Sequence, residues 1–446
     1  MLATQKALEE LARKRDQFAT YQSQHGEGLS AYRTLLAALC ERYPSAAALD
    51  ARLDVVAHET QVGARPTAEY DGWRSRVGAH TPHAPQLPAF PFAHDFAHHE
   101  QARAWAELLR GVTTFAVDGS QLPPWRDASV PLALIQVAVF ENPHEPPAPY
   151  IKDAAVTLLS PDELLNAPSD ELDERTGEDY GYSERITHLR RYELEIELIV
   201  ARMASLAGRG IQRERVVAFY DGSLIPSFAL KAPPTYRNRY AQATRNLLAA
   251  SARYRIPLIG FIDTSYARDI LTMLALLASD QQTGDQRMPG KQEARSLRDA
   301  LLWHGRLRWG DRTPAFRSAR YDLARLGQGG QQGTSDTADA ASEGIDPATE
   351  VAFVYLQTAL DRPPARIEFP MWMLNDGLLD HVMDVTRAEV IAGGGYPYPI
   401  EAADATAVIS AVDRAQFYAL FQEFAEREGL HFTFSRKALS KSRRRL

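Results

Sequence analysis

The sequence predicts an α/β fold in which a mixed sheet is flanked by helices and preceded by an N-terminal helical extension. Three observations predict it. From residue 113 onward, short runs of β-branched and aromatic residues alternate with segments of helical periodicity. Two of the apolar runs end in the same tripeptide, Asp-Gly-Ser, at residues 118–120 and 221–223. The first 80 residues instead carry apolar side chains mainly at helical spacing.

The expected elements follow a definite order after residue 100. A short helix at 101–109 precedes three strands, and helices and strands alternate from there. The strands are expected at 113–117, 132–140, 150–158, 215–220 and 257–262, and the helices at 183–206, 239–254 and 267–277. Three strands followed by alternating helices and strands are typical of the ribonuclease-H-like fold.

The chain has 446 residues, more than one domain usually contains, so we expect several regions. Residues 1–100 form the predicted helical region with a connector rich in proline and histidine. Residues 101–430 form the main α/β domain, with a Gly/Gln/Ser-rich loop near 327–344 that we expect to be disordered. Residues 431–446 form a basic tail.

The composition is that of a globular protein, with 45% hydrophobic and 24% charged residues. The sequence contains no apolar run of the roughly 18 residues that a membrane span needs, and the first residues lack the core of a signal peptide. The single cysteine, Cys40, lies in a helical apolar pattern and is predicted to be a core residue. We therefore expect a cytoplasmic location and no membrane partner.

The two Asp-Gly-Ser tripeptides predict a pair of carboxylates, Asp118 and Asp221, at the ends of neighbouring strands. A single Asp-Gly is more often an ordinary turn, but the helix between the two copies carries Glu193, Glu195 and Glu197. Glu195 is the first choice for a third carboxylate and Glu197 the second, while at least one of the three faces solvent. Such a set favours Mn²⁺ or Mg²⁺, and two such ions would suit phosphodiester hydrolysis.

The net charge of −7 argues against a uniformly basic nucleic-acid binder, but the basic residues are clustered. Residues 222–262 contain no acidic side chain, and Arg237, Arg239 and Arg245 in this segment are expected to contact a phosphate backbone. A second arginine cluster over 295–320 is interleaved with Trp303, Trp309 and Phe316. This pattern fits either a groove that stacks bases or a solvated surface with core aromatics.

Six sequence elements, in the order in which the family has them, make the sequence similar to the NurA family of nucleases. They are segment 116–120, the glutamate-bearing helix, and the segments 219–224, 259–263, 366–370 and 395–404. The resemblance implies a ribonuclease-H-like core and a homodimer that encloses DNA. It also implies a hexameric HerA-type ATPase as partner, manganese dependence, and single-strand endonuclease and 5′–3′ exonuclease activity. Asp118, a helix glutamate and Asp221 fall on the catalytic carboxylates of the family.

Two positions depart from the family pattern. Asp263 stands where many members have lysine, and Asp404 where archaeal members have histidine, although a carboxylate can also ligate a hard cation. Tyr396 either positions a phosphate or the attacking water or is a packed structural residue. The resulting hypothesis is a metal-dependent DNA nuclease in DNA end processing, repair or defence. The alternatives are a non-catalytic DNA clamp or adaptor for the translocase, and a nuclease that acts on RNA.

Overall fold

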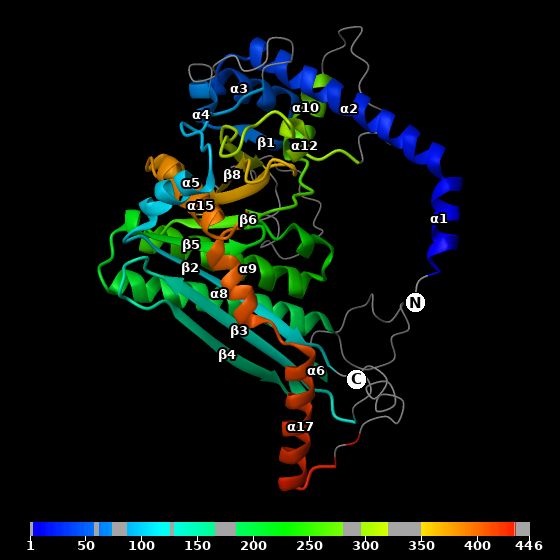
Figure 1. Cartoon of the computed structure of the whole chain (residues 1–446), viewed down its shortest axis with the longest axis vertical. Helices are drawn as coiled ribbons and strands as arrows, with labels where there is room; N and C mark the ends of the chain where they lie inside the picture. The colour runs from blue at the N-terminus through cyan, green and yellow to red at the C-terminus, as the bar shows by residue number, and fades with distance from the viewer. Residues whose placement is uncertain are drawn as a thin grey trace, which may run out of the picture. The chain divides into compact units, whose positions relative to one another are not determined.

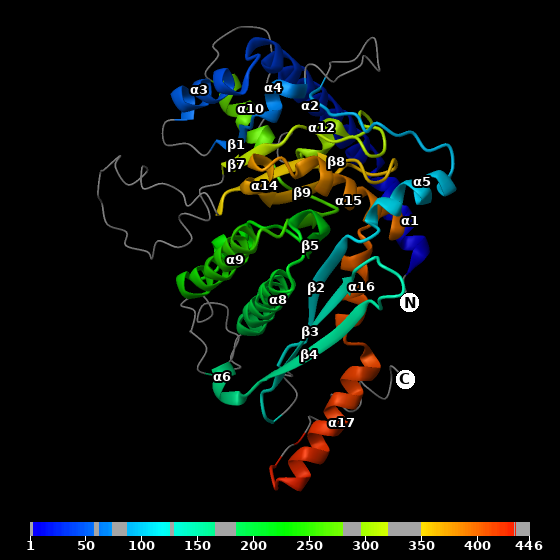
Figure 2. The ribbon, with the colours of Figure 1, turned by 90° about the vertical axis from the view of Figure 1, so that its left-hand side faces the viewer.

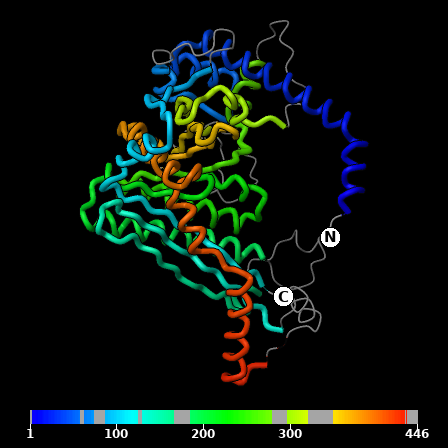
Figure 3. Tube along the Cα trace, in the orientation of Figure 1, coloured from blue at the N-terminus to red at the C-terminus, as the bar shows by residue number. Residues whose placement is uncertain are grey.

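The computed structural model describes residues 3–57, 62–73, 87–124, 129–165, 184–279, 296–319, 349–431 and 433 (Figures 1 and 3). The chain forms two compact units. The first comprises Met1–Phe96, Ile262–Tyr321 and Val351–Glu368, and the second comprises Ala97–Phe261, Asp322–Glu350 and Phe369–Leu446. The predicted loop at 327–344 and the basic tail from residue 434 lie outside the described residues.

The second unit contains the predicted mixed sheet. Its strands lie in the order β4-β3-β2-β5-β6. The first three in sequence pair antiparallel, and β5 and β6 continue from β2 as parallel strands. This arrangement confirms the predicted α/β class and mixed sheet. The strands are β2 (Thr113–Leu122), β3 (Ala133–Asn142), β4 (Ile151–Leu159), β5 (Val216–Asp221) and β6 (Leu258–Ile262).

Helices cover both faces of this sheet. Figure 2 shows α8 (Glu184–Gly208) and α9 (Pro234–Tyr254) on one side of the strands and α16 (Tyr398–Ala407) on the other. The helix α9 begins five residues before its predicted start at 239, because Pro233 and Pro234 supply a preformed first turn. Tyr192 on α8 and Thr244 on α9 share a buried hydrogen bond of 2.7 Å between their hydroxyl oxygens, which fixes the two helices together.

One boundary prediction is wrong in a way that matters for the site. Strand β2 was expected to end at residue 117, so that Asp118 would lie at a strand end. The pairing with β3 instead continues to Leu122, opposite Leu134. Asp118 therefore lies inside a strand, because the antiparallel partner supplies hydrogen bonds past the Asp-Gly-Ser tripeptide.

The first unit joins the N-terminal residues to two later segments of the chain. Its strands lie in the order β1-β7-β8-β9, and β1 and β8 both pair antiparallel with β7. The strand β1 lies within the stretch predicted as mainly helical. The elements are α1 (Thr4–Arg13), α2 (Arg15–Arg42), α3 (Ala46–Ala57), β1 (Gly63–Pro66), α4 (Glu69–Gly72), α10 (Asp269–Ser279), α12 (Ala300–Trp303), β7 (Phe316–Ala319), β8 (Val351–Leu356) and β9 (Ala365–Pro370).

The remaining helices are short, apart from α15 and α17. They are α5 (His99–Trp105), η2 (Ala106–Leu109), α6 (Pro161–Leu165), η3 (Arg213–Arg215), η4 (Ser227–Lys231), α14 (Met371–Asn375), α15 (Leu379–Ala392) and α17 (Ala411–Arg427). None of the helices among the described residues is long and apolar enough to cross a membrane.

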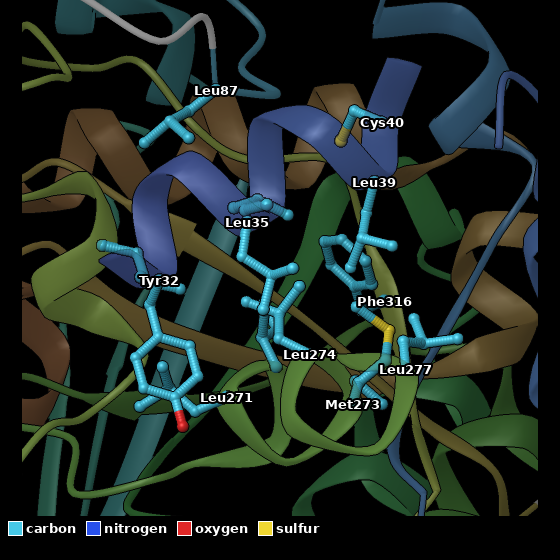
Figure 4. Close-up of a cluster of buried hydrophobic side chains, with 14 of the residues drawn as sticks. Tyr32, Leu35, Leu39, Cys40, Leu87, Leu271, Met273, Leu274, Leu277 and Phe316 are labelled. Atoms are coloured by element: carbon cyan, nitrogen blue, oxygen red, sulfur yellow. The ribbon is translucent and has the colours of Figure 1, made fainter. Parts of the chain in front are cut away.

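The core of the first unit explains why its N-terminal helices pack with later segments. Figure 4 shows Tyr32 and Leu35 of α2 in one cluster with Leu274 of α10. Cys40 belongs to the same cluster and is 2% exposed, as predicted. The domain boundary predicted near residue 100 did not anticipate this shared core.

The predicted aromatic groove over 295–320 is wrong for two of its three aromatic residues. Trp303 and Phe316 are fully buried in the first unit, and the Trp303 indole N–H donates to the carbonyl of Pro88. Arg312 is also buried and pairs with Glu69 at 2.7 Å. Trp303 and Phe316 are therefore core aromatics, as the second alternative held, whereas Arg312 is buried and does not lie on a solvated surface.

A buried charge network holds the first unit together. The Arg366 guanidinium contacts Asp269 and Glu368 at 2.7 Å each and lies 3.7 Å above the centre of the Phe353 ring. Asp299 accepts hydrogen bonds of 2.9 Å from the backbone N–H groups of residues 270 and 271, at the start of α10. All four ionic side chains are nearly excluded from solvent, so each depends on its partners for charge compensation.

We expect Arg366→Met to destabilise the protein by about 3–5 kcal/mol, because it leaves buried carboxylates without a counter-charge. Urea denaturation followed by circular dichroism measures this effect. Arg13→Ala is the matched control, since the Arg13–Glu10 pair is exposed and should leave the midpoint unchanged. An unchanged midpoint for Arg366→Met would contradict a stabilising role of the network.

Candidate active site

The two aspartates are placed by the register of β2 and β5. These parallel strands pair from Thr113↔Val216 to Val117↔Tyr220. Asp118 and Asp221 are the next residues on their strands, at the same register position and at the point where the ladder ends. Side chains at matching positions of neighbouring strands project from the same face, so the two carboxylates lie side by side.

Two further predicted residues reach this pair. Asp404 on α16 makes a side-chain hydrogen bond with Asp118. The Tyr396 hydroxyl donates to Asp221 Oδ1 at 2.7 Å, and the Tyr396 ring packs edge-on against Phe261 at 5.0 Å between ring centres. The structure thus brings together four of the six residues predicted for catalysis.

The environment of Asp118 disfavours its ionised form. Burial raises the pKa of Asp118 to about 6, and the hydrogen bond and charge of Asp404 and the charge of Asp221 add to the rise. A hydrogen bond between two carboxyl groups requires a proton on one of them. A bound cation would take the place of that proton, which suits a site for a hard divalent metal.

Glu195 approaches β2 from the α8 side. Alternation along the strand places Asp118 and Ser120 on one face, where Ser120 Oγ accepts from the backbone N–H of Ile409 just after α16. Gly119 faces α8, and a Cβ atom at this position would lie 2.5 Å from Glu195 Oε1. The glycine therefore provides the space that Glu195 occupies.

Glu195 is a buried carboxyl group beside Arg191. The residue is 5% exposed, and its Oε1 atom lies 3.5 Å from Arg191 Nη1 but accepts no hydrogen bond from the residues that the structure describes. Burial raises the pKa of Glu195 to about 8; the Arg191 charge opposes the rise, and the charges of Asp118 and Asp221 add to it. A buried carboxylate oxygen without a hydrogen-bond donor can act as a ligand for a hard cation.

The other two glutamates of α8 have different partners. Glu193 binds Arg239 of α9 at 2.6 Å and also contacts Arg190. Glu197 is 57% exposed and binds Arg190 at 2.7 Å. The structure therefore places Glu197, the second choice, on the exposed side of α8, and Glu195 against Gly119 of β2, on the side of the strand opposite to Asp118.

The predicted phosphate-binding arginines all lie on α9, which packs against α8. Arg239 is held by Glu193, and Arg245 donates to the side chain of Gln242 at 3.0 Å. Arg237 is half-buried, and its Nε atom makes no hydrogen bond. Asp263 belongs to the first unit, where it lies 3.7 Å from Arg362.

Sequence reasoning missed Arg191. Its Nη1 atom donates to the carbonyl oxygen of Gly119 at 2.7 Å and lies 3.5 Å from Glu195 Oε1. Arg191 precedes Glu195 by four residues, and this spacing on a helix is a signal that could have identified it.

The side chains at this site carry the oxygen donors that a divalent metal prefers, but they do not form a complete ligand shell. Within the described part of the chain, no three or more His, Cys, Asp or Glu side chains are arranged so that they could hold a metal ion. The carboxylates nevertheless act on one another: Asp118 shares a hydrogen bond with Asp404, and Glu195 has a buried, unbonded oxygen. Both features are those that a hard cation with oxygen ligands would satisfy.

Comparisons with known proteins show what the chain is similar to. A family model described as the NurA domain matches residues 112–409. The crystal structure of the NurA nuclease from Sulfolobus solfataricus is similar with 13% identity, covers 71% of this chain and 85% of its own, and gives a TM-score of 0.42. A structure of NurA with manganese has 11% identity, coverages of 70% and 89%, and a TM-score of 0.34. The catalytic domain of human Endonuclease V has 14% identity, coverages of 75% and 95%, and a TM-score of 0.29. No curated protein matches the chain.

Glu195→Gln should change how stability depends on pH. Because the pKa of Glu195 rises from 4.5 to about 8 on folding, the folded wild type loses stability as the pH increases through this range. In EDTA we expect the variant to exceed the wild type by a few kcal/mol above pH 8 and to match it below pH 4.5. Thermal denaturation across this range is the measurement. Glu197→Gln, on the exposed side of α8, is the control and should follow the wild-type curve. If the stability of Glu195→Gln changed with pH in parallel with that of the wild type, the raised pKa of Glu195 would be wrong.

Proposed function

The chain belongs to the NurA family, whose domain model covers residues 112–409, and from this premise we propose that it is a metal-dependent deoxyribonuclease. The observation that carries the proposal is the register that sets Asp118 beside Asp221, with Asp404 and Tyr396 joined to them. Carboxylates that raise one another's pKa mark functional sites more often than structural ones.

Asp118, Glu195 and Asp221 would hold Mn²⁺ or Mg²⁺, with Asp404 as an auxiliary ligand and Glu197 outside the set. When bound, a pair of such ions would activate a water molecule and stabilise the leaving oxygen of a phosphodiester. The donor set supports this assignment, because it consists of carboxylate oxygens, which hard cations prefer over softer metals.

Residues around the carboxylates have their own roles in the proposal. Tyr396 holds one oxygen of Asp221, so it fixes the orientation of that carboxylate next to a phosphate or the attacking water. On α9, Arg237, Arg239 and Arg245 would contact the phosphate backbone of DNA. The ion pair with Glu193 keeps the Arg239 guanidinium in place.

Family membership also supports a finer proposal. The protein would act in the cytoplasm as a homodimer with single-strand endonuclease and 5′–3′ exonuclease activity. Its partner would be a HerA-type hexameric ATPase, and its role DNA end processing, repair or defence against foreign DNA. A non-catalytic clamp for that ATPase would not need several carboxylates within electrostatic reach of one another, because their repulsion costs stability.

Asp118→Asn and Asp221→Asn should each lower DNA cleavage by about 10²-fold or more, since a bound metal ion supplies several kcal/mol of transition-state stabilisation. End-labelled single- and double-stranded DNA with Mn²⁺, Mg²⁺ or EDTA tests this. EDTA should abolish cleavage by the wild type. Asp153→Asn, on the exposed strand β4, is the matched control and should cleave normally.

Two outcomes would overturn the proposal. Cleavage that persists in EDTA, or that survives both aspartate substitutions, would exclude these carboxylates as the metal site. Absence of cleavage with either metal, even with a HerA-type ATPase present, combined with intact DNA binding, would establish the clamp instead.

A further inference from the structure

A polar seam runs between α8 and β2. His188, Arg191 and Glu195 are spaced three and four residues apart, so they lie on one face of α8. His188 contacts the Gln121 amide nitrogen through Nδ1 at 2.8 Å, and Arg191 and Glu195 meet β2 at Gly119. The seam thus leads from the proposed metal ligands along the strand toward Gln121.

Arg191 has hydrogen-bonding capacity that the described contacts leave open. A guanidinium group carries five N–H donors. Nη1 donates to the Gly119 carbonyl, and the buried Nε atom is out of reach of a ligand. The donor left for a ligand is Nη2, which makes no hydrogen bond to any residue that the structure describes. The side chain is 36% exposed, so a ligand can reach it. Its acidic neighbour, Glu195, is itself a proposed metal ligand. A bound ion would partly neutralise the negative charge of Glu195.

The neighbouring arginines are engaged differently. Arg190 has a similar exposure of 31%, but its guanidinium contacts both Glu193 and Glu197. Arg239 binds both oxygens of Glu193. Among these three arginines, Arg191 alone combines a position beside the carboxylates with an unbonded donor.

We infer that Arg191 binds the DNA phosphate that lies next to the carboxylates. This inference rests on the proposed nuclease function and names how that site holds its substrate. A guanidinium suits this role because its planar donors match the oxygens of a phosphate.

The test measures the affinity for a fluorescently labelled single-stranded oligonucleotide in EDTA. Fluorescence anisotropy reports the binding at each of a series of KCl concentrations. Arg191→Ala should weaken binding roughly tenfold, as expected for one charge-assisted phosphate contact. It should also lower the salt slope by about 0.7, because one fewer phosphate is neutralised on a single strand. Arg191→Lys should keep the wild-type slope.

Arg190→Ala is the matched control on the same helix and should bind like the wild type. Arg191→Gln, which keeps most of the side-chain volume, should show the same loss as Arg191→Ala, and circular dichroism verifies that both variants are folded. Wild-type affinity and slope in folded Arg191→Ala, or an equal loss in Arg190→Ala, would overturn the inference.

The two proposals fail in different ways. If Arg191→Ala binds normally while Asp118→Asn abolishes cleavage, the nuclease function stands and the phosphate contact of Arg191 is wrong. If the wild type neither binds nor cleaves DNA, the nuclease function itself is wrong.

Discussion

The site depends on the parallel register between β2 and β5. Five consecutive residue pairs, from Thr113↔Val216 to Val117↔Tyr220, determine that Asp118 and Asp221 come next to each other. A slip by one residue would turn one carboxylate to the opposite face of the sheet and separate the pair. The apolar residues before the aspartates enforce the register, since Phe115 and its β5 partner Ala218 are fully buried. Pairing with β3 then holds β2 straight beyond Asp118, so that α16 and Tyr396 meet a rigid edge.

This arrangement places groups together that repel one another when ionised. The pKa of Asp118 is about 6 and that of Glu195 about 8, both raised mainly by burial. The folded protein therefore keeps an unfavourable electrostatic environment at neutral pH, which the surrounding apolar core must outweigh. The Arg366 network of the first unit shows the contrasting solution, in which each buried carboxylate has a cation or backbone N–H partner. Asp118 has the Gly119 backbone N–H and Glu195 has Arg191 as partner, yet burial still raises the pKa of both carboxyl groups. Raised pKa values of this kind mark functional sites more often than structural ones.

Local sequence patterns were sufficient for the class of fold, the strands of the second unit and the two aspartates, because alternation and strand-ending signals are short-range. They could not decide among the three α8 glutamates, since that choice depends on the face that α8 turns to β2. Arg191 was missed because its importance comes from the Gly119 carbonyl across the seam. The core aromatics Trp303 and Phe316 looked like groove residues, because arginine neighbours in sequence do not reveal burial. Strand β1 was not predicted, because its partner β7 is distant in the chain.

The two Asp-Gly-Ser tripeptides share only the role of their aspartates. In β2 the glycine has an ordinary strand conformation, and its missing side chain leaves the space that Glu195 fills. Directly after β5, Gly222 has a φ of +130°, which L side chains rarely adopt, and its N–H donates to the Phe261 carbonyl. Ser223 then accepts from the backbone N–H of Ile225 to close the turn. The same tripeptide therefore has two structural roles. In the first copy it leaves room for a carboxylate, and in the second it changes the direction of the chain. What the repeat preserves is the acidic group that each strand places at the same register position.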